Sequence, residues 1–103
     1  MSDRRNLGKL ALLLSKFRED DPHLGVVQAL ALVTIADDPG LPQVTLAKAI
    51  GLSRSAAQRI CEKLIDPLGW VEYRPGDDAR ERRAYPTDKG RRVLADIDRI
   101  LSL

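Results

Sequence analysis

The sequence predicts a single domain that is mainly α-helical and carries one small β-hairpin. Three observations predict this fold. The chain has 103 residues, of which 44% are hydrophobic and 31% charged, a composition typical of one globular domain. Apolar residues recur at helical spacing through most of the chain. Strand-like alternation is confined to residues 70–85, around a Pro-Gly-Asp-Asp turn.

The first half of the chain predicts two helices. Within residues 6–18, leucines and one phenylalanine recur at helical spacing, and Asp-Asp-Pro then ends the helix. Residues 24–36 are apolar almost all round, which predicts a helix buried on most sides. An Asp-Asp-Pro-Gly turn ends that helix, and the proline within residues 41–44 leaves this segment as a loop or a short edge strand.

A pair of short helices around Gly51 follows. Thr45 is expected to be the N-cap of a helix that ends at Ile50, and Gly51 supplies the positive φ that a helix C-terminus commonly needs. The second helix is expected to begin at Ser53 or Ser55, since Ser55 also starts a capping-box pattern. An Asp-Pro-Leu-Gly sequence then breaks this helix.

A hairpin and a last helix complete the chain. Residues 70–74 alternate as the first strand, residues 75–78 form the turn, and residues 83–85 form the return strand, which Pro86 ends. Thr87 is expected to cap the final helix. This order of elements predicts a winged helix-turn-helix fold, with a three-helix core, a hairpin wing and a helix at each end of the chain.

The distribution of charge says more about partners than the total does. The net charge is only +2, but residues 54–92 hold ten basic and seven acidic residues, whereas residues 1–53 are balanced. Arginine outnumbers lysine twelve to five, which favours forked contacts to phosphate and guanine. A solvated basic face would give the same counts.

The second helix of the pair and the hairpin form a candidate DNA-binding surface. The helix can enter a major groove, where Gln58 suits adenine and Arg54 or Arg59 suits guanine, while its serines and N-terminus suit phosphate. The hairpin arginines suit a narrow minor groove. The alternative is an ordinary solvated surface whose arginines pair with acidic residues of the same loop. We expect instead that Asp78 orients one arginine and does not cancel the charge of the whole tip. The candidate residues are Thr45, Ser53, Arg54, Ser55, Gln58, Arg59, Lys63, Arg74, Arg80, Arg82 and Arg83.

Chemistry other than binding has little support in the sequence. The single cysteine, Cys61, and the single histidine, His23, exclude an internal disulfide, a thiolate-rich zinc site and a multi-histidine metal site. No nucleophile-base pair or glycine-rich phosphate loop is present, so neither an enzyme nor a bound cofactor or metal is expected. No apolar run approaches the ~20 residues of a membrane span and no signal peptide is recognised, which predicts a cytoplasmic protein.

Four segments in this order resemble the DNA-binding core of the MarR family of bacterial and archaeal regulators: Leu46–Ser55, Gly69–Glu72, Arg74–Arg80 and Tyr85–Gly90. The family's Asp-x-Arg wing element falls on Asp78 and Arg80. Its threonine-glutamate-lysine-glycine element falls on residues 87–90. The stretch after the hairpin is shorter than is usual in the family, so the resemblance is to a short variant.

The resemblance implies a homodimeric regulator of transcription, most simply a repressor, that binds double-stranded DNA. It places the recognition helix in the major groove, a wing arginine in the minor groove and the dimer contact on the helices within residues 1–19 and 88–103. The alternatives are a partition or replication protein that assembles on DNA repeats, a winged helix used only for protein contacts, and terminal helices that pack on their own domain. No effector is indicated. The candidate dimer residues are Leu7, Leu10, Leu14, Phe17, Val93, Ile97, Ile100 and Leu101.

Overall fold

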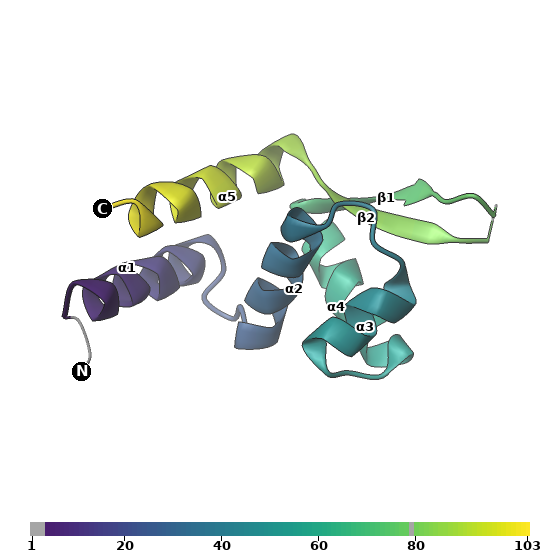
Figure 1. Cartoon of the computed structure of the whole chain (residues 1–103), viewed down its shortest axis with the longest axis horizontal. Coiled ribbons are helices and arrows are strands. Elements are labelled where there is room, and N and C mark those ends of the chain that lie inside the picture. The colour runs from purple at the N-terminus through teal and green to yellow at the C-terminus, as the bar shows by residue number, and fades with distance from the viewer. Residues whose placement is uncertain (1–3, 79) are drawn as a thin grey trace.

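The computed structural model describes residues 4–78 and 80–103, so Ala79 of the Asp-x-Arg element and the first three residues of the expected terminal segment 1–19 lie outside the described residues. Helices α1 and α5 lie side by side at one end of the molecule, and the hairpin projects from the other end (Figure 1). The prediction of a mainly helical winged helix-turn-helix fold is confirmed. The elements are α1 (Arg4–Asp20), α2 (Val26–Asp37), α3 (Gln43–Ile50), α4 (Arg54–Ile65), β1 (Val71–Pro75), β2 (Arg82–Pro86) and α5 (Asp88–Leu101).

The core lies where α2 packs against α3, α4 and β2. The side chains of Leu32 and Ile35 on α2 are completely buried there, together with Leu46 of α3. The expectation that residues 24–36 form a helix buried on most sides is wrong for part of its surface. Val26 is 77% exposed, and Leu30 and Val33 are exposed too, because the packing partners of α2 lie mainly on its other side.

Helix α3 begins earlier than the sequence predicted. Its first residue is Gln43 and its N-cap is Pro42, whose carbonyl accepts a hydrogen bond from the Thr45 amide at 3.0 Å. Thr45 is therefore inside the first turn and is not the cap. The fixed φ of proline suits the start of a helix, and its missing N–H is not needed there. Pro42 also makes an isolated antiparallel bridge to Arg83, so the expected short edge strand is reduced to one residue.

The turn between α3 and α4 follows the sequence closely. Gly51 has a left-handed conformation with φ +72° and ends α3, as predicted. Ser53 is the N-cap of α4, because its hydroxyl accepts a hydrogen bond from the Ala56 amide at 3.2 Å. The alternative cap at Ser55, with its capping box, is wrong. The side chain of Gln58 points along the helix and donates to the Glu62 carboxylate at 3.2 Å.

The wing, residues 71–86, is a two-stranded antiparallel hairpin in which Val71 pairs with Pro86. The return strand is one residue longer at each end than predicted, since it runs from Arg82 to Pro86. Proline is tolerated at the last position of the strand, where its missing donor costs no ladder hydrogen bond. The register places alternate residues of each strand on the two faces of the hairpin.

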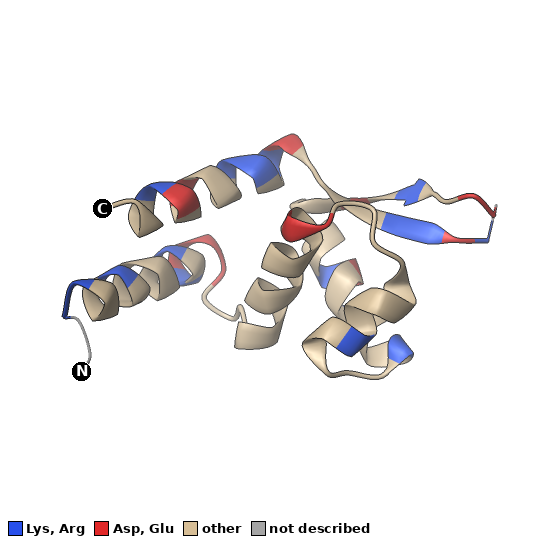
Figure 2. Cartoon of the chain, viewed as in Figure 1, with Lys and Arg blue, Asp and Glu red and all other residues tan. Residues whose placement is uncertain are grey.

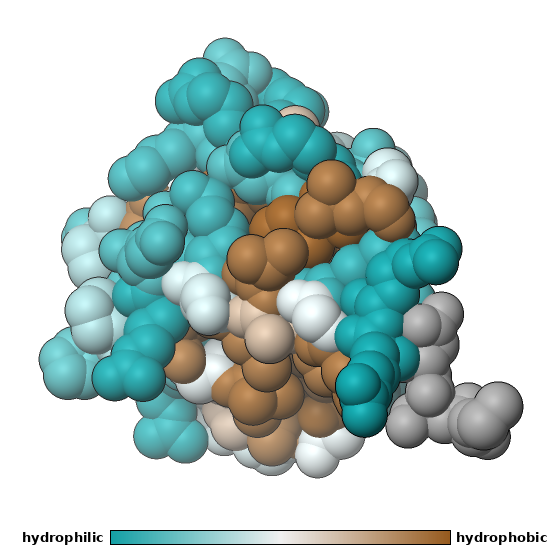
Figure 3. Space-filling view, turned by 90° about the vertical axis from the view of Figure 1, so that its left-hand side faces the viewer, coloured by the Kyte–Doolittle hydropathy of each residue, from teal (hydrophilic) through white to brown (hydrophobic). Residues whose placement is uncertain are grey.

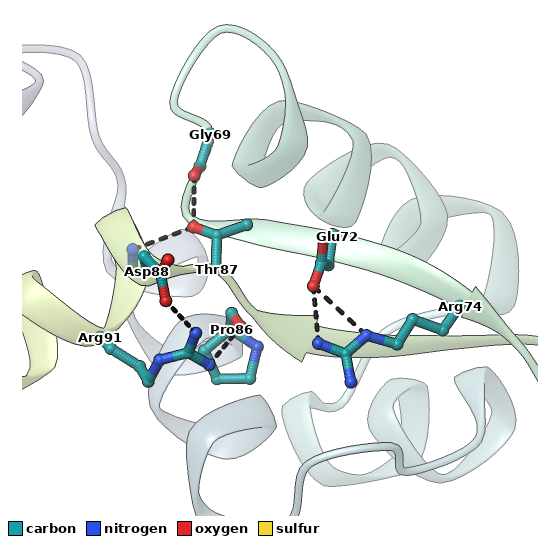
Figure 4. Close-up of polar contacts among 8 residues, drawn as sticks. Gly69, Glu72, Arg74, Pro86, Thr87, Asp88 and Arg91 are labelled. Carbon is teal, nitrogen blue, oxygen red and sulfur yellow. Dashed lines mark hydrogen bonds and ion pairs between the residues drawn. The ribbon is translucent and has the colours of Figure 1, made fainter.

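Helix α5 is fixed to the base of the wing by its first turn. Thr87 caps α5 as predicted, because its hydroxyl accepts from the Gly90 amide at 3.0 Å and donates to the Gly69 carbonyl at 2.6 Å (Figure 4). The Thr87 amide donates to the Trp70 carbonyl at 3.0 Å. The Trp70 side chain is buried, and the centre of its ring lies 6.4 Å from the centre of the Phe17 ring on α1. Trp70 therefore joins both terminal helices to the core.

Candidate nucleic-acid interface

A basic groove lies between α4 and the wing. It has a volume of about 510 Å³, and four of the predicted DNA-binding side chains line it. Two of these side chains come from the first half of α4 and two from the far end of the wing, so the fold brings together residues separated by more than twenty positions in sequence. The lining residues are Pro42, Gln43, Val44, Arg54, Gln58, Tyr73, Arg80, Glu81 and Arg82.

Helix α4 presents its first two turns to solvent beside this groove. Arg54, Ser55, Gln58 and Arg59 are exposed, while Ala57, Cys61 and Leu64 on the opposite side of the helix are buried in the core. The Ser53 hydroxyl accepts from the Ala56 amide and so caps the helix, while its own O–H can still act as a donor. Arg59 is exposed but does not line the groove.

The tip of the wing carries both acidic and basic residues, and further basic residues lie on both of its strands (Figure 2). Asp78 accepts a hydrogen bond from the backbone amide of Arg80 at 3.0 Å. This contact holds the backbone at Arg80, and the expectation that Asp78 orients an arginine side chain stays a prediction. The Arg80 side chain is exposed. Arg82 lies on the groove side, with its guanidinium carbon 5.9 Å from the centre of the Tyr73 ring.

Two other wing arginines, Arg74 and Arg83, lie on the outer face of the hairpin, where they are directly opposite in the strand register. Arg74 is 2.7 Å from the Glu72 carboxylate (Figure 4). Its guanidinium carbon also lies 4.3 Å from the centre of the Tyr85 ring. Arg83 donates to the Gly40 carbonyl at 2.9 Å and pairs with Glu81 at 2.9 Å. Neither residue lines the basic groove, and their role as DNA contacts stays a prediction.

Two further candidates lie away from the groove lining. Lys63 stands in the last turn of α4, and its ammonium group is 3.9 Å from the Asp21 carboxylate in the connection between α1 and α2. Thr45 is exposed in the first turn of α3. The groove therefore contains Arg54, Gln58 and the wing arginines Arg80 and Arg82 as its polar candidates.

A partly buried polar cluster, of which Gln43 and Tyr73 line the groove, was not predicted. Gln43 donates to the Tyr73 hydroxyl at 3.0 Å and lies 3.7 Å from the sulfur of Cys61. Burial raises the pKa of the Tyr73 hydroxyl and of the Cys61 thiol, so both groups are neutral at physiological pH. Sequence reasoning missed Gln43 because it started α3 at Thr45. The proline at position 42 was the signal that placed Gln43 inside the helix.

The predicted dimer residues divide into two groups. Leu7, Leu10 and Leu14 on α1 and Leu101 on α5 are each more than half exposed. Ile100 is half-buried. The other three are buried in the core of their own chain, and their part in a dimer contact stays a prediction: Phe17, Val93 and Ile97. Exposed apolar residues that the sequence did not single out are Leu12, Val26, Leu30, Val33, Val44 and Leu103.

Two further features were sought in the described residues: a helix that could cross a membrane and a cluster of side chains that could hold a metal ion. Within residues 4–78 and 80–103, no helix combines the length and the apolar composition that a membrane crossing requires. In the same ranges, no three histidine, cysteine, aspartate or glutamate side chains come together as a possible metal site.

The helix-turn-helix of α3 and α4, the hairpin beside it and the basic groove between them define a winged helix-turn-helix protein. The chain belongs to the MarR family, whose family model matches residues 24–81. That match spans α2, α3, α4, β1 and the turn of the wing.

Individual relatives agree with this assignment. The chain is 32% identical over 93 residues to the HTH-type transcriptional regulator YybA of Bacillus subtilis, covering 86% of this chain and 61% of YybA. It is 34% identical over 85 residues to the HTH-type transcriptional regulator PetP of Rhodobacter capsulatus, covering 79% of this chain and 51% of PetP. The crystal structure of RV1404 from Mycobacterium tuberculosis has the same fold, with a TM-score of 0.75 at 23% identity over 88% of this chain and 62% of RV1404. The chain thus spans between half and two thirds of the length of these three proteins.

Proposed function

We propose that this chain is a transcriptional repressor that binds double-stranded DNA as a homodimer. The start of α4 enters the major groove, and the end of the wing follows the adjacent minor groove. The observation that carries the proposal is the basic groove, because it gathers Arg54, Gln58, Arg80 and Arg82 from two distant segments around one concave surface. Repression is the simplest consequence of occupying a promoter.

The chemistry of the groove supports this assignment. Arg54 offers a forked donor for guanine or phosphate, and Gln58 offers the paired donor and acceptor that suit adenine. The amide of Gln58 is already oriented by Glu62. Arg80, which is exposed beside the groove, suits the negative potential of a narrow minor groove. Glu81 also lines the groove, but its carboxylate pairs with Arg83.

An exposed apolar surface at the ends of α1 and α5 supports the homodimer. Figure 3 shows apolar side chains gathered on this end of the molecule, bordered by hydrophilic ones. The two helices form one unit, since the Lys9 ammonium donates to the Leu101 carbonyl at 3.1 Å and Lys16 lies 3.4 Å from Asp96. Monomeric proteins rarely expose contiguous apolar patches of this kind. The surface, which we call the terminal apolar surface, comprises Leu7, Leu10, Leu14, Leu101 and Leu103.

Selection of bound duplexes from a random pool tests the proposed function. A dimer that reads one face of DNA selects a palindrome whose half-sites are about one helical turn, ~34 Å, apart. A run of direct repeats in the selected sequences would indicate an assembly protein instead of a simple repressor. No salt-dependent enrichment of any duplex would contradict DNA binding altogether.

The dimer can be tested with Leu10→Asp. We expect this variant to sediment as a monomer of 11.4 kDa, whereas the wild type sediments as a dimer, because a carboxylate at a buried apolar contact is costly to desolvate. Leu10 is 51% exposed in the single chain, so the variant retains its helical circular dichroism. Ser15→Asp introduces the same charge at an exposed position of α1 and serves as the control. A dimeric Leu10→Asp variant would show that the contact lies elsewhere.

A further inference from the structure

The outer face of the wing is fastened to the segment that leads into α3. The Gly40 amide donates to the Ala84 carbonyl and the Gly40 carbonyl accepts from the Arg83 guanidinium, both at 2.9 Å. Pro42 adds an antiparallel bridge to Arg83. Gly40 has φ +85°, and a Cβ there would lie 2.6 Å from the Tyr85 hydroxyl, so the backbone can approach the wing this closely only at a glycine.

The groove face of the wing is fastened to the same segment from the other side. Gln43, the first residue of α3, donates to the Tyr73 hydroxyl at 3.0 Å. Tyr73 and Arg83 point to opposite faces of the hairpin, since Tyr73 pairs with Ala84 and Arg83 pairs with Arg74. Residues 40–43 therefore hold the wing on both of its faces.

The far end of the wing is linked to this attachment through one carboxylate. Glu81 pairs with the same Arg83 guanidinium that binds Gly40. The Glu81 carbonyl also accepts from the Gly76 amide at 3.0 Å, which closes the turn next to Arg80. Arg83 is therefore linked, through Glu81, to the turn that carries Arg80.

We propose that Arg83 and Tyr73 are positioning residues which, by clamping the wing to residues 40–43, set the angle at which Arg80 reaches DNA relative to α4. This inference rests on the proposed function and refines it. Arg83 acts through Arg80 and does not itself bind phosphate. The clamp holds α4 and the wing in one fixed arrangement. This lowers the conformational entropy that is lost when both bind a duplex together.

A double-mutant cycle distinguishes positioning from direct contact. Arg83→Met removes the guanidinium, and with it the hydrogen bond to the Gly40 carbonyl and the ion pair with Glu81. We expect this variant to bind the selected duplex roughly tenfold more weakly. In an Arg80→Ala background the same substitution is expected to change affinity less than about twofold, because the arginine that it positions is already absent. Arg83→Lys restores part of the affinity by reaching one partner. Equal decreases in the two backgrounds would show that Arg83 acts independently of Arg80 and would overturn the proposal.

Arg74→Met is the matched control for charge. Arg74 lies directly opposite Arg83 in the register and on the same outer face, but its partners Glu72 and Tyr85 belong to the wing itself. We expect its effect on affinity to be the same with and without Arg80. Hydroxyl-radical footprinting adds a second readout. Arg83→Met is expected to lose protection beside the minor groove and to keep it at the major-groove contacts of α4.

Hydrogen exchange in the free protein tests the clamp without DNA. Both Arg83→Met and Tyr73→Phe are expected to speed exchange of the Gly40 amide about tenfold, while amides of α5 are unchanged. Unaltered exchange at Gly40 in both variants would overturn the proposal even if the chain binds DNA. Faster exchange at Gly40, together with no binding of any duplex by the wild type, would retain the clamp and contradict the proposed function.

Discussion

Gly90→Ala is expected to lower the free energy of unfolding by about 3 kcal/mol or more, since it forces a backbone displacement in a packed region. Gly90 is buried in the first turn of α5. A Cβ at this position would lie 2.0 Å from the Trp70 carbonyl oxygen, which is a backbone atom that cannot move aside alone. That carbonyl also accepts the Thr87 amide, so α5 would separate from the base of the wing. Thermal unfolding is expected to show a midpoint lower by roughly 15 °C.

Gly8→Ala is the matched control for this substitution. Gly8 lies inside α1, and a Cβ built there meets nothing within 4 Å. Alanine is the better helix former, so this variant is expected to gain up to about 1 kcal/mol of stability. A Gly90→Ala variant as stable as the wild type would mean that α5 does not approach Trp70 as closely as the structure indicates.

The double variant Arg54→Ala/Arg80→Ala is expected to lose on the order of a hundredfold in affinity for the selected duplex, from about 1–3 kcal/mol per arginine. The two arginines stand on opposite sides of the basic groove, one on α4 and one on the wing. Removing an arginine that binds a phosphate lowers the slope of log affinity against log salt by about one. Titrations at several salt concentrations therefore measure both the decrease in affinity and its electrostatic origin.

A control with the same change of charge is Arg18→Ala/Arg92→Ala. Both residues are exposed, on α1 and α5, and neither lines the basic groove. We expect affinity to fall only a few fold, because the remaining effect is long-range attraction that salt screens. If the two double variants bound the duplex equally well, the DNA-binding surface would lie outside the basic groove.

Much of the fold was predictable because its signals are local. Gly51 ends α3 because a left-handed residue is needed there, and Thr87 caps α5 through an amide three residues away. Prediction of the start of α3 was less accurate. Thr45 is a good N-cap by residue type, but the N-cap is Pro42, so the helix already begins at Gln43. Ser53 and Ser55 were equivalent by type, and only the backbone conformation at Ser53 selects between them.

The functional site was only half predictable, because local signals do not determine which side chains reach it. The sequence determined that basic residues cluster on α4 and the wing, and that the terminal helices carry apolar side chains. Tertiary structure decided which of them are available. It directed Arg82 to the groove and Arg83 to a carbonyl 43 residues earlier in the chain. It also buried Phe17 and left Leu10 exposed on the same helix. Caps and turns depend on neighbouring residues, whereas the direction of a side chain depends on strand register and on distant segments, and local patterns do not contain that information.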